Sequence, residues 1–199
     1  MLVCKELRGV PLMQRHNIVV RTLVNAAMLA GVETRVEVTQ PCLNEAFDEE
    51  RELRPDVEIN GGMGRLLVDV VVVNSVAPSN IARRSDASIA KSVEKDEKKL
   101  TAIEQAERTK RSKYVKLAET LNATFVPFAC DVFGAMGKSA HSLVKWLIRE
   151  AKAVGRFDDP QEERDFRDTV YSWLSVAIQR AVAVSAFSGL ARIRNRLRA

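Results

Sequence analysis

Residues 54–74, RPDVEINGGMGRLLVDVVVVN, constrain the fold more than any other stretch of the chain. They predict two strands, residues 54–60 and 66–73, separated by a tight turn. Three glycines supply the turn, Gly61, Gly62 and Gly64. Because the second strand is almost wholly apolar and β-branched, it is typical of a central strand buried on both faces. The chain is therefore expected to fold around this hairpin.

Each predicted strand carries an aspartate, Asp56 in the first and Asp69 in the second. An isolated buried charge is too costly, so each carboxylate must be paired, hydrogen-bonded or bound to a metal ion. If the strands form a hairpin, the two aspartates lie near each other across it, and two converging carboxylates indicate a Mg²⁺ site. A structural interpretation is also open, in which Asp56 caps a turn after Pro55 and Asp69 pairs with Arg54 or Arg65.

The length and composition are those of one globular domain, or of one core with a helical extension. The chain has 199 residues, of which 46% are hydrophobic and 29% are charged. A net charge of +5 and a pI of about 9.3 permit a polyanionic partner without requiring one.

Three widely spaced cysteines, Cys4, Cys42 and Cys130, lack metal-ligand spacing and indicate reduced thiols in an intracellular protein. The N-terminal residues carry charges where a secretory signal needs a continuous apolar run. No run is expected to reach the length of a membrane span, so no membrane partner is predicted.

Periodicity and breakers predict the remaining elements. After an irregular first dozen residues, we expect a helix over residues 15–30 that Gly31 ends, a strand over 32–38, a loop or short helix over 44–53, the hairpin, a charged helix over 81–121, a strand over 124–132, and helices over 138–154 and from 161 to 190 or beyond. Trp146 and Trp173 lie on apolar helical stripes and are assigned to the core. This order predicts an α/β fold with a mixed central sheet flanked by helices, in which residues 1–135 form the core and residues 136–199 a helical extension packed on it.

Several stretches, in this order, resemble a known family: RHNIVVRTLVNAAMLAG from Arg15, RVEV from Arg35, RPDVEI, LVDVVVVNSVAPS from Leu67, and KYVKLAETLNATFVPFACDVFG from Lys113. An Arg-Pro-Asp opening one strand, with a second acid thirteen positions on, is similar to the PD-(D/E)XK nuclease core. More narrowly, the chain resembles the restriction-like endonuclease domain at the C-terminal end of reverse transcriptases of site-specific non-LTR retrotransposons.

The resemblance implies a restriction-endonuclease-like core and a set of site residues. Asp56 and Asp69 match the metal-binding acids, and Glu37 in RVEV is placed to add a third carboxylate. The usual motif has a lysine two residues beyond the second acid, where this chain has Val71. In the relatives a lysine from a neighbouring helix is implied to serve instead, and Lys113 matches that position.

The implied activity is Mg²⁺- or Mn²⁺-dependent nicking of DNA, in the nucleus, as part of or derived from a reverse transcriptase polyprotein. Five residues are candidate nucleic-acid contacts: Arg54, His16, Lys110, Arg111 and Tyr114. Because of Val71, a second interpretation is open, a nucleic-acid-binding module that keeps the fold without the chemistry. A third is a structural helical protein with no nucleic-acid role.

Overall fold

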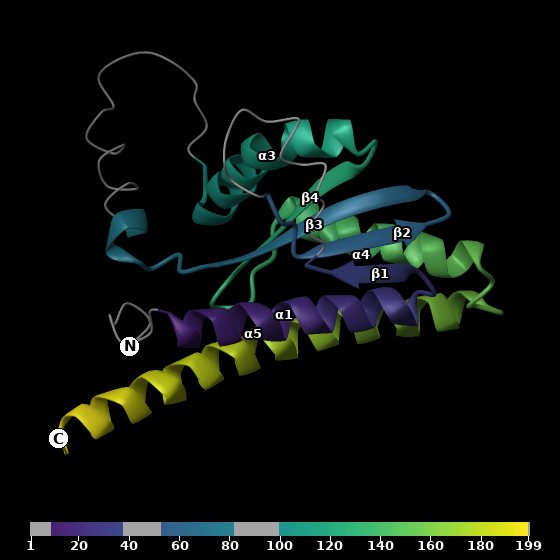
Figure 1. Ribbon diagram of the computed structural model, residues 1–199. Coiled ribbons are helices and arrows are strands. Elements are labelled where there is room, and N and C mark those ends of the chain that lie inside the picture. Colours follow the sequence, from purple (N-terminus) through teal and green to yellow (C-terminus); the bar gives the residue numbers. More distant parts are fainter. Residues whose placement is uncertain (1–8, 38–52, 82–99, 199) are drawn as a thin grey trace, which may run out of the picture.

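The computed structural model describes residues 9–37, 53–81 and 100–198 (Figure 1). Its elements follow the chain as α1 (Val10–Leu29), β1 (Glu33–Val36), β2 (Val57–Gly61), β3 (Gly64–Val73), α3 (Ala102–Thr120), β4 (Thr124–Asp131), α4 (Lys138–Ala153) and α5 (Pro160–Arg196). The predictions for Cys4 and Cys42, for residues 44–52 and for residues 82–99 of the charged helix lie outside the described residues.

The four strands form one mixed sheet in the order β1-β2-β3-β4. β1, β2 and β3 pair antiparallel in succession, and β2 and β3 form the predicted hairpin, with Gly61 opposite Gly64. β4 joins β3 in parallel after the crossover through α3. The predicted class, a mixed sheet flanked by helices with a long C-terminal helix, is confirmed.

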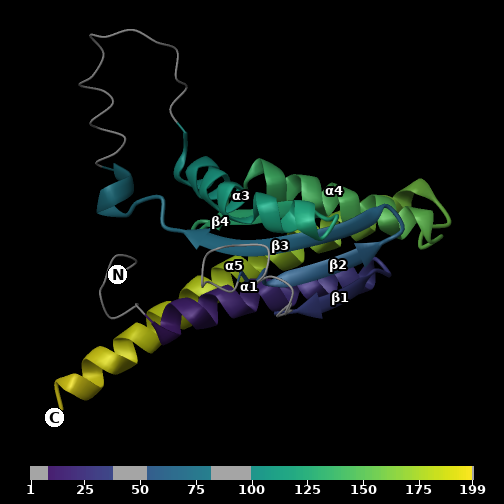
Figure 2. The same cartoon turned by 45° about the horizontal axis from the view of Figure 1, so that its top comes forward.

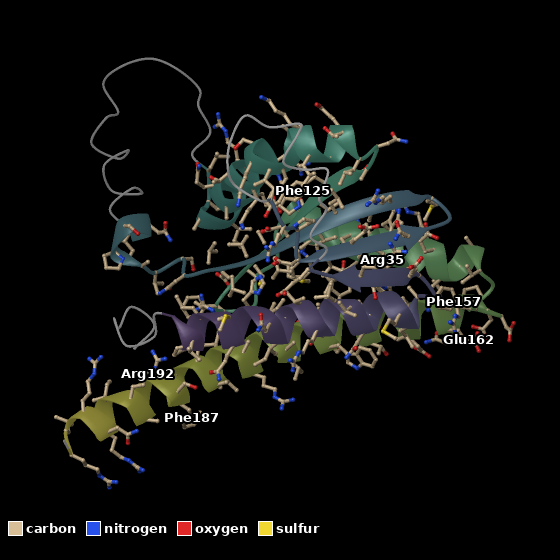
Figure 3. All side chains as sticks on the ribbon, viewed as in Figure 1. Arg35, Phe125, Phe157, Glu162, Phe187 and Arg192 are labelled. Carbon is tan, nitrogen blue, oxygen red and sulfur yellow. The ribbon has the colours of Figure 1, made fainter. Side chains whose placement is uncertain are left out.

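β3 divides the interior into two layers because its side chains alternate between the faces of the sheet. Leu66, Val68 and Val70 pack in the larger cluster, together with buried residues of α1, α4 and α5. Leu67 packs in a smaller cluster with residues of α3 and with Phe125 of β4. Figures 2 and 3 show α3 on one side of the sheet and the α1–α5 pair on the other. The predicted burial of the second hairpin strand is confirmed for residues 66–70, whereas residues 71–73 are half-buried.

α1 and α5 lie side by side and run in opposite directions (Figure 1). Near the start of α1, Ser188 of α5 donates a hydrogen bond to Gln14. The first dozen residues were predicted to be irregular, but α1 begins at Val10, so this prediction is wrong for residues 10–12. Gly31, at φ 82°, ends α1 as predicted, since its left-handed backbone suits glycine.

The buried stripe of α5 follows the predicted spacing, with one exception. Val170, Leu174, Ile178 and Ala181, spaced three or four residues apart, are buried. The assignment of Trp173 to the core is wrong, because its side chain is 41% exposed on the opposite face of the helix, whereas Trp146 of α4 is buried as predicted. 

α5 also corrects the prediction about membrane-spanning length. Among the described helices it is long and apolar enough to cross a membrane by length and composition, with a mean hydropathy of 1.4 over its best window. Of the 18 most apolar consecutive residues of α5, 33% are buried within the protein. A long helix that buries one apolar face against α1 has the same length and apolar composition as a membrane-spanning helix.

The helix predicted over residues 81–121 is not continuous through residues 100 and 101. Thr101 has extended backbone and caps α3, accepting a hydrogen bond from the Glu104 N–H while the Glu104 carboxylate accepts one from the Thr101 N–H. This reciprocal capping box starts a new helix at Ala102 because it satisfies donors that the first turn leaves unpaired.

The hairpin turn is held by a carboxylate from α4. Glu150, which is buried, accepts hydrogen bonds from the backbone N–H groups of Gly62 (2.9 Å) and Met63 (2.7 Å). Bonds of this kind to an ionised group are stronger than neutral ones. Glu150 therefore fixes the end of the hairpin against α4.

Candidate active site

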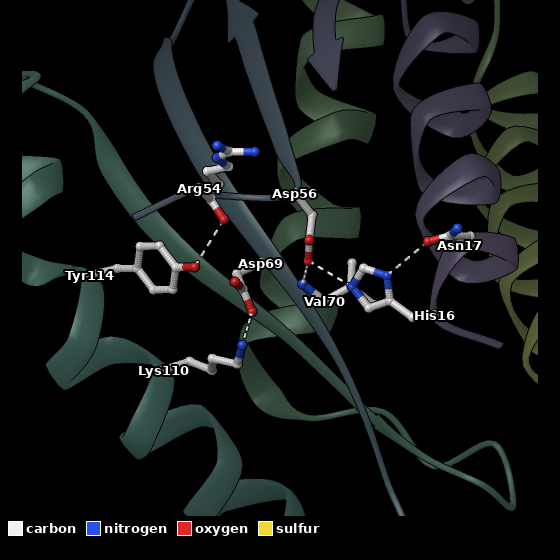
Figure 4. Close-up of polar contacts among 8 residues, drawn as sticks. All are labelled: His16, Asn17, Arg54, Asp56, Asp69, Val70, Lys110 and Tyr114. Atoms are coloured by element: carbon white, nitrogen blue, oxygen red, sulfur yellow. Dashed lines mark hydrogen bonds and ion pairs between the residues drawn. The ribbon is translucent and has the colours of Figure 1, made fainter. Parts of the chain in front are cut away.

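The register of the hairpin brings the two predicted aspartates together. Val57, the first residue of β2, pairs with Val68 of β3. Asp56, just before Val57, therefore lies opposite Asp69. Their backbones are opposed, but Asp56 lies in the bend before β2 and its carboxylate contacts His16 of α1, whereas the Asp69 carboxylate contacts Lys110 of α3. Figure 4 shows both carboxylates, with His16 on one side and Lys110 and Tyr114 on the other.

Asp56 is held by two donors. Its Oδ2 atom accepts a hydrogen bond from the Val70 backbone N–H at 2.6 Å and lies 2.9 Å from Nε2 of His16. The Val70 bond ties the carboxylate to β3, and the His16 contact ties it to α1. Asp56 is therefore more than a cap of the turn after Pro55.

The other ring nitrogen of His16 also faces an acceptor, since Nδ1 lies 3.3 Å from Oδ1 of Asn17. An imidazole donates from both nitrogens only when it is protonated. The hydrogen bond to Asp56 raises the pKa of His16 above its ordinary value of 6.5, against the opposing effect of burial, and the charge of Asp69 adds to the rise. The contact with Asp56 thus favours the protonated, positively charged form of His16.

The pKa of His16 can be measured directly. Following its imidazole by NMR during a pH titration, in a His141→Gln background that leaves one histidine, should give a midpoint above 6.5. Because the folded pKa is raised, the stability from this contact is present below the unfolded pKa and is lost as pH rises through the folded pKa. Asp56→Asn should lower the midpoint. A midpoint at or below the ordinary value, or one that Asp56→Asn leaves unchanged, would contradict the assigned contact.

Asp69 is 3% exposed and faces α3. Nζ of Lys110 lies 2.6 Å from its Oδ2 atom. The same Oδ2 atom has no partner with hydrogen-bond geometry among the described residues, so the contact is an ion pair with poor angular alignment. The structural alternatives for Asp69, pairing with Arg54 or Arg65, are not the contacts observed; Arg65 instead pairs with Glu58 at 2.9 Å.

Lys110 lies on the side of β3 to which Val71 also points. Val71 is two residues beyond Asp69, so both side chains point to the α3 face of β3. Val71 and Lys110 line one open cleft of about 260 Å³ between β3 and α3. Its other lining residues are Val73, Asn80, Ala102, Gln105, Ala106 and Thr109. α3 thus delivers the cation that the strand does not.

Tyr114, one helical turn after Lys110, anchors α3 over the site. Its ring stacks on Phe125 with centroids 4.7 Å apart, and its hydroxyl donates a hydrogen bond to the Arg54 carbonyl at 3.0 Å. Burial, and then the nearby charge of Asp69, raise the pKa of the Tyr114 hydroxyl, which keeps it neutral. The predicted site residue Tyr114 is therefore positioned as a buried support.

The remaining predicted residues lie around the site without joining it. Lys113 is exposed, with Nζ 5.0 Å from the centre of the Tyr114 ring. Glu37 is exposed just after β1, and only its backbone reaches the site, through an N–H bond to the Asp56 carbonyl at 3.1 Å. Arg111 donates to Ser139 at the start of α4, and Arg54 is exposed beside Tyr114.

Asp56 and Asp69 are the carboxylates that would hold a Mg²⁺ ion at this site. Within residues 9–37, 53–81 and 100–198 no group of three histidine, cysteine, aspartate or glutamate side chains converges. Mg²⁺ commonly keeps several waters and uses one or two carboxylates with substrate phosphates, so two are enough. The Oδ2 atom of Asp69, buried and without an aligned donor, is a suitable ligand atom.

The sequence was also compared with known proteins. It matches no model of a known protein family and no curated protein at a significant level.

Proposed function

We propose that this chain is a metal-dependent DNA endonuclease domain of the restriction-like fold, related to the domain found at the end of retroelement reverse transcriptases. One observation carries the proposal. Two aspartates stand in register across a hairpin, and a lysine from the crossover helix contacts the second of them.

The arrangement of the elements supports the same fold. The order is helix, three antiparallel strands, helix and a parallel fourth strand, which agrees with the nuclease core. In that core the first acid opens the second strand and the next acid lies within the third, as Asp56 and Asp69 do here. Since one fold hosts many functions, the site rather than the fold carries the proposal.

The site residues divide into acids that hold a cation and cations that balance them. Asp56 and Asp69 would hold Mg²⁺ or Mn²⁺, which polarises a phosphate and lowers the pKa of bound water. Val70 orients Asp56 through its N–H group. Lys110 sits beside Asp69, where it can face the negative charge that builds on a phosphate during hydrolysis.

The exposed side of α3 offers contacts to a DNA backbone. It carries four exposed basic residues, Arg108, Arg111, Lys113 and Lys116. Positive side chains along one helix bind phosphates with an affinity that falls as salt rises. Recognition of a specific DNA target sequence would come from other parts of a larger parent chain, such as a reverse transcriptase region.

The proposal is tested by incubating the purified chain with supercoiled plasmid in Mg²⁺ or Mn²⁺, with a chelator as the control. Conversion to the open circle that requires the metal supports the nuclease. A folded chain that binds plasmid at low salt and leaves it intact in both metals would favour the module without chemistry. A folded chain that does not bind DNA even at low salt would overturn both.

Lys110 and Lys113 form a matched pair for a finer test. Lys110→Ala should slow nicking about tenfold or more, because it removes the cation beside Asp69. Lys113→Ala removes the same charge three residues away on an exposed side chain, and should change salt-dependent binding more than the single-turnover rate at saturating protein. Equal loss of that rate in both variants would contradict a distinct role for Lys110.

A second candidate is a nucleic-acid-binding module without catalysis, and the charge balance of the site favours it. Asp56 contacts His16, which is a cation when it is protonated, and Asp69 contacts the ammonium group of Lys110, so both carboxylates have partners without a metal ion. Binding of Mg²⁺ must therefore displace or reorient at least one of them. Isothermal titration calorimetry with Mn²⁺ distinguishes the two candidates. The nuclease predicts saturable Mn²⁺ binding that Asp69→Asn abolishes, whereas the module without catalysis predicts no such binding.

A further inference from the structure

α5 has a second apolar face, opposite the one that packs on α1. The positions of this face recur at alternating spacings of three and four residues, and we call them the outer stripe: Trp173, Val176, Arg180, Ala183, Phe187, Leu190, Arg194 and Leu197. The buried stripe, which includes Leu174, Ile178 and Ala181, lies on the other side of the helix. α5 is therefore apolar on two faces, of which α1 covers one.

The outer stripe is strongly exposed. Val176 is 66% exposed and Phe187 is 71% exposed. Large apolar side chains that are exposed together along one line mark an interaction surface. In its seven-residue repeat all four fourth positions are apolar, and the first positions alternate between an aromatic residue and an arginine. Apolar first and fourth positions are the pattern of a helix that packs against another helix, and this stripe follows it at six of its eight positions.

The charges of α5 are segregated along its length. Its first turns hold four acids, Glu162, Glu163, Asp165 and Asp168, with two arginines among them. After Asp168 the sequence has five arginines and no acid. Figure 3 shows Glu162 and Arg192 at opposite ends of the helix. A partner helix in the reverse direction, with the reverse gradient, complements this charge.

We infer that the outer stripe binds a second copy of this chain, with the two α5 helices antiparallel. A second copy supplies both requirements, an identical heptad stripe and the reverse charge gradient. With the two-fold axis between residues 181 and 182, Trp173 meets Leu190 and Val176 meets Phe187. Arg180 of one copy then faces the small Ala183 of the other. The aliphatic part of Arg180 can pack there while its guanidinium group reaches solvent.

The same axis brings the ends of the helices into charge complementarity. Asp165 lies opposite Arg198, and Asp168 lies near Arg194. A parallel pair would place arginine beside arginine and aspartate beside aspartate, and like charges across an interface disfavour that orientation. The direction of the pair is therefore set by the charges, and its register by the apolar positions.

A lipid bilayer is the competing occupant because of the apolar composition of α5. Arg180 is exposed in the middle of the outer stripe, and a charge at the centre of a membrane helix is costly. The second copy is therefore favoured, and membrane binding becomes an outcome of the test.

The first test is sedimentation velocity of the full chain across the micromolar range. We expect a monomer–dimer equilibrium whose dissociation constant Phe187→Glu raises about tenfold or more, since it places a charge in the seam. Met28→Glu is the matched control, because Met28 is a 60% exposed apolar residue of α1 away from the stripe, and it should leave the constant unchanged. A chain that is monomeric throughout the range, or a dimer that Phe187→Glu leaves intact, overturns the proposal, as does a monomer that floats with neutral phosphatidylcholine vesicles.

The second test is a charge swap that reports the orientation. Asp165→Arg with Asp168→Arg should weaken the dimer, and adding Arg194→Asp with Arg198→Asp should restore it. In a parallel dimer the first pair of changes replaces one like-charge contact with another, so rescue by the second pair is not expected. Circular dichroism of each variant confirms that the helix is retained. A dimer that is weakened by the first pair and not rescued by the second contradicts the antiparallel arrangement.

Discussion

Asp69→Asn should lower the rate of metal-dependent plasmid nicking about a hundredfold or more. The change keeps the size of a side chain that is 3% exposed and removes the charge that would hold the cation. A loss of about 3 kcal/mol of transition-state stabilisation corresponds to this factor, and a metal ion supplies stabilisation of that order. The measurement is the initial rate of open-circle formation at saturating Mg²⁺ or Mn²⁺.

Asp131→Asn is the control for this substitution. Asp131 is also a buried carboxylate, and it stands beside Val73 on the neighbouring strand. Its Oδ1 atom accepts hydrogen bonds from the N–H groups of Phe133 and Ala135, so it closes a turn and does not join the site. Asp131→Asn should lower the melting temperature and leave nicking by the folded protein intact. If Asp69→Asn nicks at the wild-type rate, Asp69 does not hold the metal.

The second large effect is on stability, and it concerns the hairpin turn. Gly61→Ala should lower the free energy of unfolding by about 3 kcal/mol. A Cβ atom at Gly61 would lie 2.6 Å from the Glu150 carboxylate and 2.7 Å from the Trp146 ring. Glu150 would have to move, and its bonds to the Gly62 and Met63 N–H groups would be strained or lost. Urea unfolding followed by circular dichroism measures the change.

Gly62→Ala provides the matched comparison, one residue along the same turn. A Cβ atom there meets Glu150 at 3.6 Å, which is ordinary contact. Gly62→Ala should therefore cost much less than Gly61→Ala. Equal losses for the two variants would mean that the turn responds to any side chain, and that the close packing of Gly61 on α4 is not the cause.

The hairpin and its two aspartates were predictable because they depend on neighbouring residues. The glycines after Ile59 and the β-branched run that contains Asp69 fix both the turn and the strands. Once the turn is known, the register that places Asp56 opposite Asp69 follows by counting. Periodicity was equally sufficient for α4, which covers the predicted residues 138–153 and buries Leu143 and Leu147, four positions apart.

The partner of Asp69 was harder to predict because it depends on how α3 is rotated against the sheet. Tyr114 and Leu117 form the buried side of α3, and Lys110 lies on the same side one turn earlier, whereas Lys113 lies at its border. That helical spacing was a usable signal. A motif match to KYVKLAE pointed to Lys113, since a motif carries position in the sequence and not orientation in space.

Trp173 shows the opposite limitation. Its size and its place in an apolar helix predict burial, but α5 has two apolar faces and α1 covers one. Single-helix periodicity does not tell which of two apolar faces meets the core. Pairing with α1, a long-range contact, decides it.

The connectivity around the site has a consequence for the order of folding. Asp56 and Asp69 meet through a hairpin that closes over a short loop, whereas β4 pairs with β3 only after the chain has continued through α3. Contacts that are distant in sequence form more slowly, since a larger loop must be closed. His16 is 40 residues from Asp56, and Lys110 also arrives from far along the chain. We therefore expect the hairpin to bring the two like charges near each other before either counter-charge arrives, so that docking of α1 and α3 relieves their repulsion.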